Sequence, residues 1–213
     1  MPQRLGSVLY LILLAGLAFG SAMATPYRAA EALGWRLDCD SSAHGIPRKP
    51  LDSTGELQPL AAPRIGVRKS ERKLMLYSGD KLVRTYRAAL GLSPLGDKVR
   101  EGDRRTPEGD FYIFTKNDRS AFYLSLGISY PNAAHAERGM RDGLINKSQY
   151  DTILAALSAH KAPPQNTRLG GDIYIHGNGS GSDWTWGCVA LENEDIRELF
   201  NLVGLGTPVS IRP

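Results

Sequence analysis

Short stretches in which apolar and polar residues alternate recur over the C-terminal part of the chain, and they limit its fold more than any other feature. The alternation begins with Ile65 and Val67. It continues with Leu74 and Leu76, and turn-forming residues at 78–80 lead into a third stretch. A period of two is typical of β-strands that bury one face, and such turns are typical of hairpins. We therefore expect a mainly β core.

The rest of this region divides into strands and helices by the same reasoning. Further strands are expected at 82–90, 111–114, 121–128, 172–175 and 208–211. Apolar residues spaced three and four apart predict helices at 133–142, 151–161 and 193–204. Asn193 is expected to be the N-cap of the last helix. The predicted fold class is mainly β with peripheral helices, in one domain.

The first residues of the chain predict where the protein is sent. Arg4 precedes an apolar run at 8–19, and Ala-Met-Ala at 22–24 matches a small-residue cleavage site. We interpret residues 1–24 as a secretory signal peptide, which would export the protein to the periplasm or cell envelope. An uncleaved membrane anchor is the alternative, but glycines interrupt the run, which is shorter than the ~20 residues that a span needs.

The composition changes after this segment. Residues 25–62 begin with a helix-prone piece and continue as a stretch rich in Pro, Ser and Asp, so we expect an N-terminal segment and linker there. The main folded domain is then expected at 63–213. The formal net charge of +4 comes from scattered basic residues. Without a nucleic-acid-binding motif, such scattering favours a solvated surface or an anionic cell-wall polymer over a nucleic-acid partner.

His176 and Cys188 are the pair with the most chemical content. They lie twelve positions apart, one at the end of a predicted strand and the other after a loop rich in Gly and Ser. A thiolate is the attacking form of cysteine, and an imidazole can take the thiol proton near neutral pH. Gly187 has no side chain, so its amide and that of Cys188 could reach the oxyanion that forms when a carbonyl is attacked. The pair therefore favours thiol acyl transfer.

Other interpretations of the pair stay open at this level. His176 could be a satisfied histidine at a strand end and Cys188 a small buried residue, or Cys188 could form a disulfide with Cys39. A structural metal site needs four ligands, and one Cys with one His falls short. We expect no metal and no organic cofactor. His135 and His160 are expected to be surface histidines.

Neighbouring residues connect the pair to a known family. The run IHGNGSGSDWTWGCVALENEDI at 175–196 resembles the signature of the L,D-transpeptidase catalytic domain (YkuD-like) family, an HG pair followed by an S/T-x-G-C-[IV]-x-[LM] box. Residues 65–91 resemble the opening hairpin of that family, and RTPEGDF at 105–111 resembles its T-P-x-G-x-F turn. The resemblance covers roughly residues 63–212 and implies a β-sandwich or barrel-like catalytic fold.

The resemblance also implies roles for matching residues. Cys188 would be the nucleophile, His176 the base, and Gly187 with its neighbours the oxyanion hole. The residues that would complete the oxyanion and substrate-binding site are Gly177, Thr185, Trp186, Tyr130 and Asn132. Two positions depart from the family pattern: Trp186 stands where many members have His or Lys, and Ala190 where they have Arg.

Several residues around this motif have two interpretations. Tyr-Pro-Asn at 130–132 could form a lip that grips a peptide, or a simple capped turn. Trp184 and Trp186 would point the same way if their segment alternated as a strand, and one of them could shape the pocket. Asp172 and Asp183 could orient the imidazole, although a backbone carbonyl could do so equally well.

The activity that the resemblance implies is acyl transfer on peptidoglycan. Cys188 would attack the carbonyl between diaminopimelate and D-alanine in a stem peptide, expel D-alanine and hold the stem as a thioester. The acceptor could be the amine of another stem, a lysine of a wall-tethered lipoprotein, or water. The stretches 130–133 and 169–172 resemble a branch of the family that includes enzymes that cut such links. A peptidoglycan hydrolase with the same pair, or a non-catalytic wall-binding module, are the alternatives.

Overall fold

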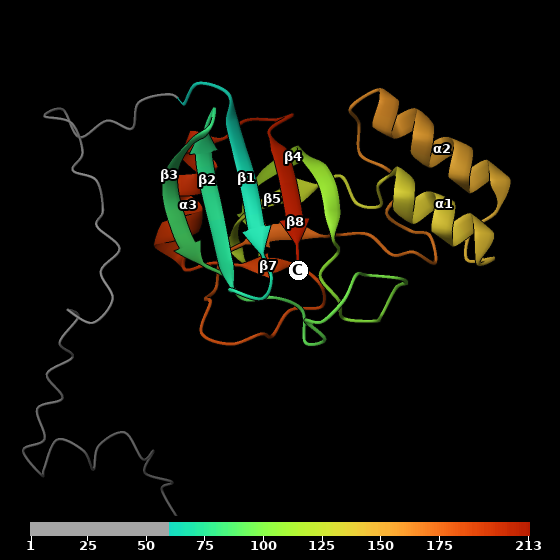
Figure 1. The fold of residues 1–213 in the computed structure, drawn as a ribbon, viewed down its shortest axis with the longest axis horizontal. Helices are drawn as coiled ribbons and strands as arrows, with labels where there is room; N and C mark the ends of the chain where they lie inside the picture. Colours follow the sequence, from blue (N-terminus) through green and yellow to red (C-terminus); the bar gives the residue numbers. More distant parts are fainter. Residues whose placement is uncertain (1–59) are drawn as a thin grey trace, which may run out of the picture. The chain divides into compact units, whose positions relative to one another are not determined.

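The computed structural model describes residues 60–213, which form eight strands and three helices (Figure 1). The strands are β1 (Pro63–Arg68), β2 (Lys73–Ser78), β3 (Lys81–Arg87), β4 (Gly109–Ser120), β5 (Tyr123–Ile128), β6 (Tyr174–His176), β7 (Val189–Ala190) and β8 (Pro208–Arg212). The helices are α1 (Ala133–Arg141), α2 (Lys147–Ser158) and α3 (Asn193–Leu202). The expected fold class, mainly β with peripheral helices, is confirmed.

All eight strands join one mixed sheet in the order β3-β2-β1-β8-β4-β5-β6-β7. β1 pairs with β8 and β6 with β7 in parallel, while the other neighbours are antiparallel. The C-terminal strand β8 therefore lies inside the sheet, between β1 and β4 (Figure 1). In β1 the side chains of Ile65 and Val67 are buried between exposed arginines, as the period of two predicts.

The sheet curls until its two ends meet. Ala89, just beyond β3, bridges Ala190 of β7 through two reciprocal backbone hydrogen bonds of 2.8 and 2.9 Å. Gly91 forms a parallel bridge with Thr185, in the segment before β7, where Thr185 bonds to Leu90 and Leu92 on either side of Gly91. A Cβ at Gly91 would lie 2.2 Å from the carbonyl oxygen of Arg104, so only glycine allows this approach. The chain that leaves one edge strand thus reaches the other, which gives the sheet the form of a half-barrel.

Helix α3 closes the main core. Ile196 and Leu199 of α3 are buried together with the inward-facing side chains of the strands, and the helix packs against β5. Lys116 of β4 reaches the end of the helix, where its ammonium donates hydrogen bonds to the carbonyls of Phe200 and Val203. A cation at this end satisfies free carbonyls and suits the helix dipole.

Helices α1 and α2 pack side by side and form a second, smaller core beside the sheet (Figure 1). Its fully or nearly buried residues are Ala136, Ile145, Ile153 and Leu169. Gly139 of α1 makes room for Leu169, because a Cβ there would lie 2.6 Å from Leu169 Cδ2. This contact holds the segment that leads into β6.

Several elements are placed differently from the prediction. Strand β3 spans 81–87 rather than 82–90, and β5 begins at 123 rather than at 121. Helix α2 spans 147–158 rather than 151–161, because Asn146 and Gln149 form a reciprocal capping box that starts the helix earlier. Strand β4 spans 109–120 rather than 111–114. Its polar second half pairs with β5 in the sheet, so tertiary pairing extends the strand beyond its apolar part.

The approach to the proposed site also differs at two boundaries. The N-cap of α3 is Glu192 and not Asn193. Asn193 instead accepts a 2.9 Å hydrogen bond from the amide of Asn178. Strand β6 begins at Tyr174 rather than at 172, because Asp172 has a φ of 53°, which an extended strand does not permit.

Several expectations concern residues that precede the described part of the chain. The signal peptide at 1–24, almost all of the segment at 25–62, and Cys39 lie there. Among residues 60–213, no helix is both long and apolar enough to cross a membrane.

Candidate active site

Strands β6 and β7 bring His176 and Cys188 to the same part of the sheet. The strands pair in parallel with His176 opposite Ala190. Two residues before each of these, the backbone amide of Tyr174 donates to Cys188 Sγ at 3.4 Å. Because side chains alternate between the two faces of a strand, His176 and Cys188 lie on one face, offset by two residues along it.

The imidazole of His176 is buried, and one of its ring nitrogens is held by the backbone. Its side chain is only 3% exposed, and its Nδ1 lies 2.8 Å from the carbonyl oxygen of Gly177. A carbonyl can only accept, so Nδ1 carries the hydrogen and Nε2 is left with its lone pair. Burial lowers the pKa of the imidazole, and the bond to Gly177 opposes that effect. A backbone carbonyl therefore orients the ring, one of the two arrangements considered from the sequence.

Two aromatic rings enclose this imidazole. Phe122, in the turn between β4 and β5, stacks on it with ring centroids 4.7 Å apart and planes 30° apart. Trp184 meets it edge-on at 5.5 Å and 68°, and the two aromatic rings are 5.8 Å from each other. Sequence reasoning missed Phe122, since nothing in a single Phe at a hairpin turn indicates a distant histidine.

Cys188 rests as a neutral free thiol. Its Sγ accepts from the Tyr174 amide and donates to the carbonyl of Asp172 at 3.5 Å. Burial raises the pKa of the thiol to about 11; the hydrogen bond from Tyr174 lowers it, the carboxylate of Asp172 raises it and the ammonium of Lys98 lowers it. Within residues 60–213 the sulfur makes no hydrogen bond to His176. Hydrogen bonds between catalytic groups often form or shorten only when substrate binds.

Thr185 shapes the turn that presents the cysteine. Its hydroxyl donates to the Cys188 carbonyl at 2.8 Å and accepts from the Gly187 amide at 3.1 Å. Its own backbone is fixed by bonds to Leu90 and Leu92 on the segment that closes the sheet. Thr185 is buried, so its part in this structure is to hold the turn.

The backbone conformation at position 187 requires glycine, independently of the oxyanion role expected of this residue. Its φ is 132°, and a Cβ would lie 2.8 Å from the carbonyl oxygen of Arg105 and 3.1 Å from Ile173 Cδ1. Thr106, next to Arg105, accepts from the Gly91 amide at 3.0 Å, and its hydroxyl lies 3.5 Å from the Cys188 carbonyl. The three motif blocks recognised in the sequence therefore meet at the cysteine turn.

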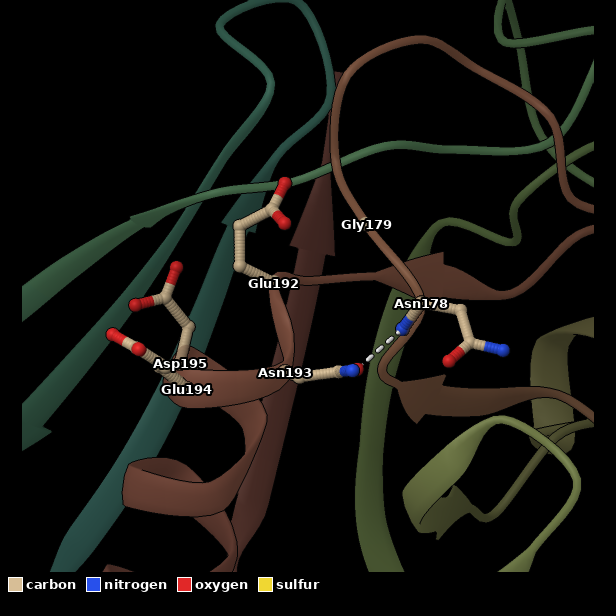
Figure 2. Close-up of a pocket in the computed structure, with 6 residues that line it drawn as sticks. All are labelled: Asn178, Gly179, Glu192, Asn193, Glu194 and Asp195. Carbon is tan, nitrogen blue, oxygen red and sulfur yellow. Dashed lines mark hydrogen bonds between the residues drawn. The ribbon is translucent and has the colours of Figure 1, made fainter. Parts of the chain in front are cut away.

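The loop between His176 and Cys188 is braced by the start of α3 (Figure 2). Asn193 accepts from the Asn178 amide at 2.9 Å, the dashed line in Figure 2. Glu192 accepts from both the amide and the hydroxyl of Ser180, at 2.7 and 2.8 Å. A pocket lies at this junction, lined by Asn178, Gly179, Glu192, Asn193, Glu194 and Asp195. Its lining includes neither the histidine nor the cysteine.

The two aspartates considered as partners of the imidazole serve elsewhere. Asp183 forms an ion pair with Arg72, with the closest atoms 2.7 Å apart, and accepts from the Leu90 amide at 2.9 Å. Asp172 contacts Cys188 through its backbone carbonyl. Asp183 therefore ties the loop to the turn between β1 and β2, and its carboxylate is already engaged.

Tyr130 lies in the core rather than on the lip of a cleft. Its side chain is fully buried, its hydroxyl donates to the Leu169 carbonyl at 2.9 Å, and its ring meets His135 edge-on at 4.9 Å. Burial raises the pKa of the phenol. A ring enclosed in this way joins the end of β5 to the second core and presents no surface to a peptide.

Asn132 forms a capped turn, one of the two structures considered for it from the sequence. It is the N-cap of α1, accepting from the His135 amide at 3.1 Å, and it also donates to the Asp110 carbonyl at 3.3 Å. His135 is buried rather than at the surface, and its Nε2 lies 3.0 Å from the Asp97 carboxylate, which also pairs with Arg138. The spacing of apolar residues that predicted a helix at 133–142 gave no sign of this polar cluster.

The two tryptophans of the loop do not point the same way. Trp184 is half-buried against His176, and its Nε1 donates to the Gly179 carbonyl at 3.0 Å. Trp186 is 68% exposed, with the Arg104 guanidinium 5.0 Å from its ring centroid. Their segment turns here instead of running as a strand, so the alternation assumed from the sequence does not apply.

The described residues hold no group of three or more His, Cys, Asp or Glu side chains arranged to bind a metal ion. A free cysteine and a buried histidine on adjacent strands of a curled, mainly β sheet define the general class, proteins with a cysteine–histidine site. Residues 62–211 match the model of the family described as L,D-transpeptidase catalytic domain. The chain belongs to this family, whose members act on peptidoglycan and are typically cysteine enzymes.

Individual relatives are distant. The Escherichia coli (strain K12) protein named "Putative L,D-transpeptidase YafK" is 27% identical over 162 residues, which cover 72% of this chain and 52% of that protein. The chain thus spans about half the length of the curated relatives it matches. Among solved structures, Bd1075 of Bdellovibrio bacteriovorus aligns with a TM-score of 0.47 at 22% identity, over 72% of this chain and 48% of that one. L,D-transpeptidase 1 of Mycobacterium tuberculosis aligns with 0.41 at 13%, over 71% and 62%.

Proposed function

We propose that this protein is an exported L,D-transpeptidase that transfers the acyl group of a peptidoglycan stem peptide through Cys188. The observation that carries the proposal is the pairing of a free thiol with a buried imidazole whose Nε2 has no hydrogen. Membership of the L,D-transpeptidase family supplies the substrate class. The predicted signal peptide at 1–24 supports export to the periplasm or cell envelope.

The proposed reaction has two balanced steps. In the first, Nε2 of His176 takes the thiol proton, and Sγ of Cys188 attacks the carbonyl between diaminopimelate and D-alanine. The peptide bond breaks, a thioester forms, and D-alanine leaves with the proton returned by the imidazolium. In the second, an acceptor amine gives a proton to His176, attacks the thioester and releases the thiol. Water in place of the amine would give a trimmed stem.

Backbone amides at the cysteine turn are the proposed stabilisers of the oxyanion. The Gly187 amide already donates to the Thr185 hydroxyl, so we assign the Cys188 amide first and the Gly187 amide second. Gly187 contributes by allowing the close approach of this turn to the Arg105 carbonyl oxygen and Ile173, which a Cβ would prevent. Gly177 fits a related requirement beside His176, because a Cβ there would lie 2.5 Å from Asn193 Oδ1 and 2.9 Å from the Phe122 carbonyl oxygen.

Because the thiol is neutral in the free protein, we propose that substrate binds before the thiol loses its proton. A pKa of about 11 leaves almost no thiolate at neutral pH. We therefore assign proton transfer to the bound complex, where the stem peptide displaces water and Sγ turns from the Asp172 carbonyl toward His176. The same observation favours the second candidate, a wall-binding module in which Cys188 never ionises.

Mass spectrometry of peptidoglycan fragments tests the proposal. The purified protein and its Cys188→Ala variant are each incubated with tetrapeptide muropeptides, and separately with cell wall that carries a tethered lipoprotein. Loss of D-alanine with formation of a crosslinked dimer, absent from Cys188→Ala, is the expected result. Trimmed stems without dimers would assign a carboxypeptidase, and released lipoprotein alone would assign a hydrolase of that link.

A binding measurement separates the enzyme from the wall-binding module. If neither substrate yields a Cys188-dependent product, and both proteins bind muropeptides with equal affinity in calorimetry, the acyl-transfer proposal is overturned. His176→Gln is the matched control. It should abolish the products while leaving muropeptide binding within about threefold, because the proposed role of the imidazole is proton transfer.

A further inference from the structure

The aromatic rings around His176 come from two separate parts of the chain. Phe122 belongs to the turn between β4 and β5, and Trp184 to the loop between His176 and the cysteine turn. Their rings lie 4.7 and 5.5 Å from the imidazole, one stacked on its face and the other edge-on. Two chain segments thus place aromatic rings on one histidine.

Both residues are hydrogen-bonded to the backbone beside the histidine, Phe122 through its own backbone and Trp184 through its ring. The Phe122 carbonyl accepts from the Gly177 amide at 3.0 Å. The indole Nε1 of Trp184 donates to the Gly179 carbonyl at 3.0 Å, and its amide donates to the Leu90 carbonyl at 3.2 Å. Both residues are therefore anchored to the same strand end that carries His176.

The exposure of Phe122 indicates that its position serves more than the core. Its side chain is 43% exposed, yet it stacks on a side chain that is only 3% exposed. Folding alone rewards moving such a ring inward, away from water. Here the ring stays at the surface and covers the solvent side of the imidazole.

We propose that Phe122 and Trp184 are positioning residues that clamp His176 in one ring orientation, with Nδ1 on the Gly177 carbonyl and Nε2 left to accept the proton of Cys188 when substrate binds. This inference rests on the proposed function, because the proton transfer is part of it. The clamp excludes water from one face and one edge of the ring, so the imidazole stays neutral to lower pH than an exposed histidine. Phe122 and Trp184 touch no reacting atom and act through the imidazole.

Titration of His176 by NMR tests the clamp without relying on any substrate. The variants are Phe122→Leu and Trp184→Leu, with Tyr123→Leu as the matched control. Tyr123 follows Phe122 as the first residue of β5 and is similarly exposed, at 40%. The full chain is labelled with ¹⁵N on its four histidines, and the His176 signals are assigned by their loss in His176→Gln. Thermal unfolding confirms that each variant is folded.

In the wild-type protein the ¹⁵N shifts should report hydrogen on Nδ1, with a titration midpoint below the ordinary value of about 6.5. Each clamp variant should raise that midpoint by about 0.5–1 and broaden or shift the Nε2 signal, because water reaches the ring. Tyr123→Leu should leave both unchanged. Trp184→Phe, which keeps a ring and loses the bond to Gly179, should lie between wild type and Trp184→Leu.

Midpoints and ¹⁵N shifts equal to wild type in both leucine variants would overturn the clamp, whatever the activity on muropeptides. An equal rise in Tyr123→Leu would also overturn it, because the effect would then belong to the whole turn. A clamp that behaves as expected in a protein without Cys188-dependent products would retain the inference about His176 and remove the proposed reaction. Crosslinked product together with an unchanged His176 midpoint in the clamp variants would retain the proposed reaction and remove the clamp.

Discussion

The Thr185 hydroxyl donates a 2.8 Å hydrogen bond to the carbonyl of Cys188, and this bond closes the turn that presents the thiol. The same oxygen accepts from the Gly187 amide. One buried side chain thus bonds to both a donor and an acceptor of this turn.

Replacing Thr185 by Val should lower the free energy of unfolding by about 1–3 kcal/mol, because two buried backbone groups lose their partner while shape is kept. Urea denaturation of the full chain measures the change. Thr185→Ser keeps the hydroxyl and should recover most of the loss. Equal losses in the Val and Ser variants would show that the methyl group, and not the hydroxyl, stabilises the turn.

Gly187→Ala should be more damaging than an ordinary glycine substitution. A side chain at a φ of 132°, with its Cβ 2.8 Å from the Arg105 carbonyl oxygen, costs about 1–3 kcal/mol in backbone strain alone. Gly181→Ala is the control in the same loop, since a Cβ there meets nothing within 4 Å. It should change the unfolding free energy by no more than about 0.5–1 kcal/mol. Similar melting temperatures for the two variants would refute the steric argument.

The thiol of Cys188 should alkylate with an apparent pKa above the ordinary cysteine value of about 8.5 in the free protein. Its burial raises the pKa to about 11. The rate of reaction with iodoacetamide is measured against pH in a Cys39→Ala background, so that Cys188 is the one remaining thiol. A midpoint well below 8.5 would mean that His176 already holds the proton at rest, contrary to the geometry of Sγ on the Asp172 carbonyl.

The same raised pKa predicts how stability changes in alkali. The folded state keeps the thiol proton longer than the unfolded state, so its stability is complete below pH 9 and falls as pH rises from 9 toward 11. The rise from the ordinary thiol value to about 11 corresponds to roughly 3 kcal/mol at most. Cys188→Ala should lack this slope. Parallel stability curves for the two proteins between pH 8 and pH 11 would contradict the assignment.

Asp97 should make acid stability depend on its cluster. Burial raises the pKa of its carboxyl, but hydrogen bonds from His135, the Glu108 amide and Arg138 prevail and lower it from 3.8 to about 2. A lowered folded-state pKa contributes stability that is present above pH 3.8 and is lost as pH falls toward 2. Asp97→Asn should remove roughly 2 kcal/mol at pH 7 and flatten the acid limb. An unchanged acid midpoint in denaturation would contradict this.

Local chemistry in the sequence was sufficient for most of the strands and for the cysteine–histidine pair. Ile65 and Val67 are buried as their alternation predicted, because period two and one buried face are properties of a single strand. The start of α2 was misplaced, since Asn146 and Gln149 act as a capping box only once both side chains fold back on the helix. A lip was one of two interpretations of Tyr130, and the residue is core, because its burial depends on Leu169, which lies 39 residues away along the chain.

By itself, then, the sequence determined the fold class, the family and the two residues that we propose for the chemistry, since each rests on residue type and short-range spacing. Only the tertiary structure decided the state of those two residues. The rings of Phe122 and Trp184 against His176, the Gly177 carbonyl that orients the imidazole, and the burial that raises the pKa of Cys188 are seen only in the folded chain. Distance along the chain says nothing of such contacts, because burial and dielectric environment are properties of the folded neighbourhood.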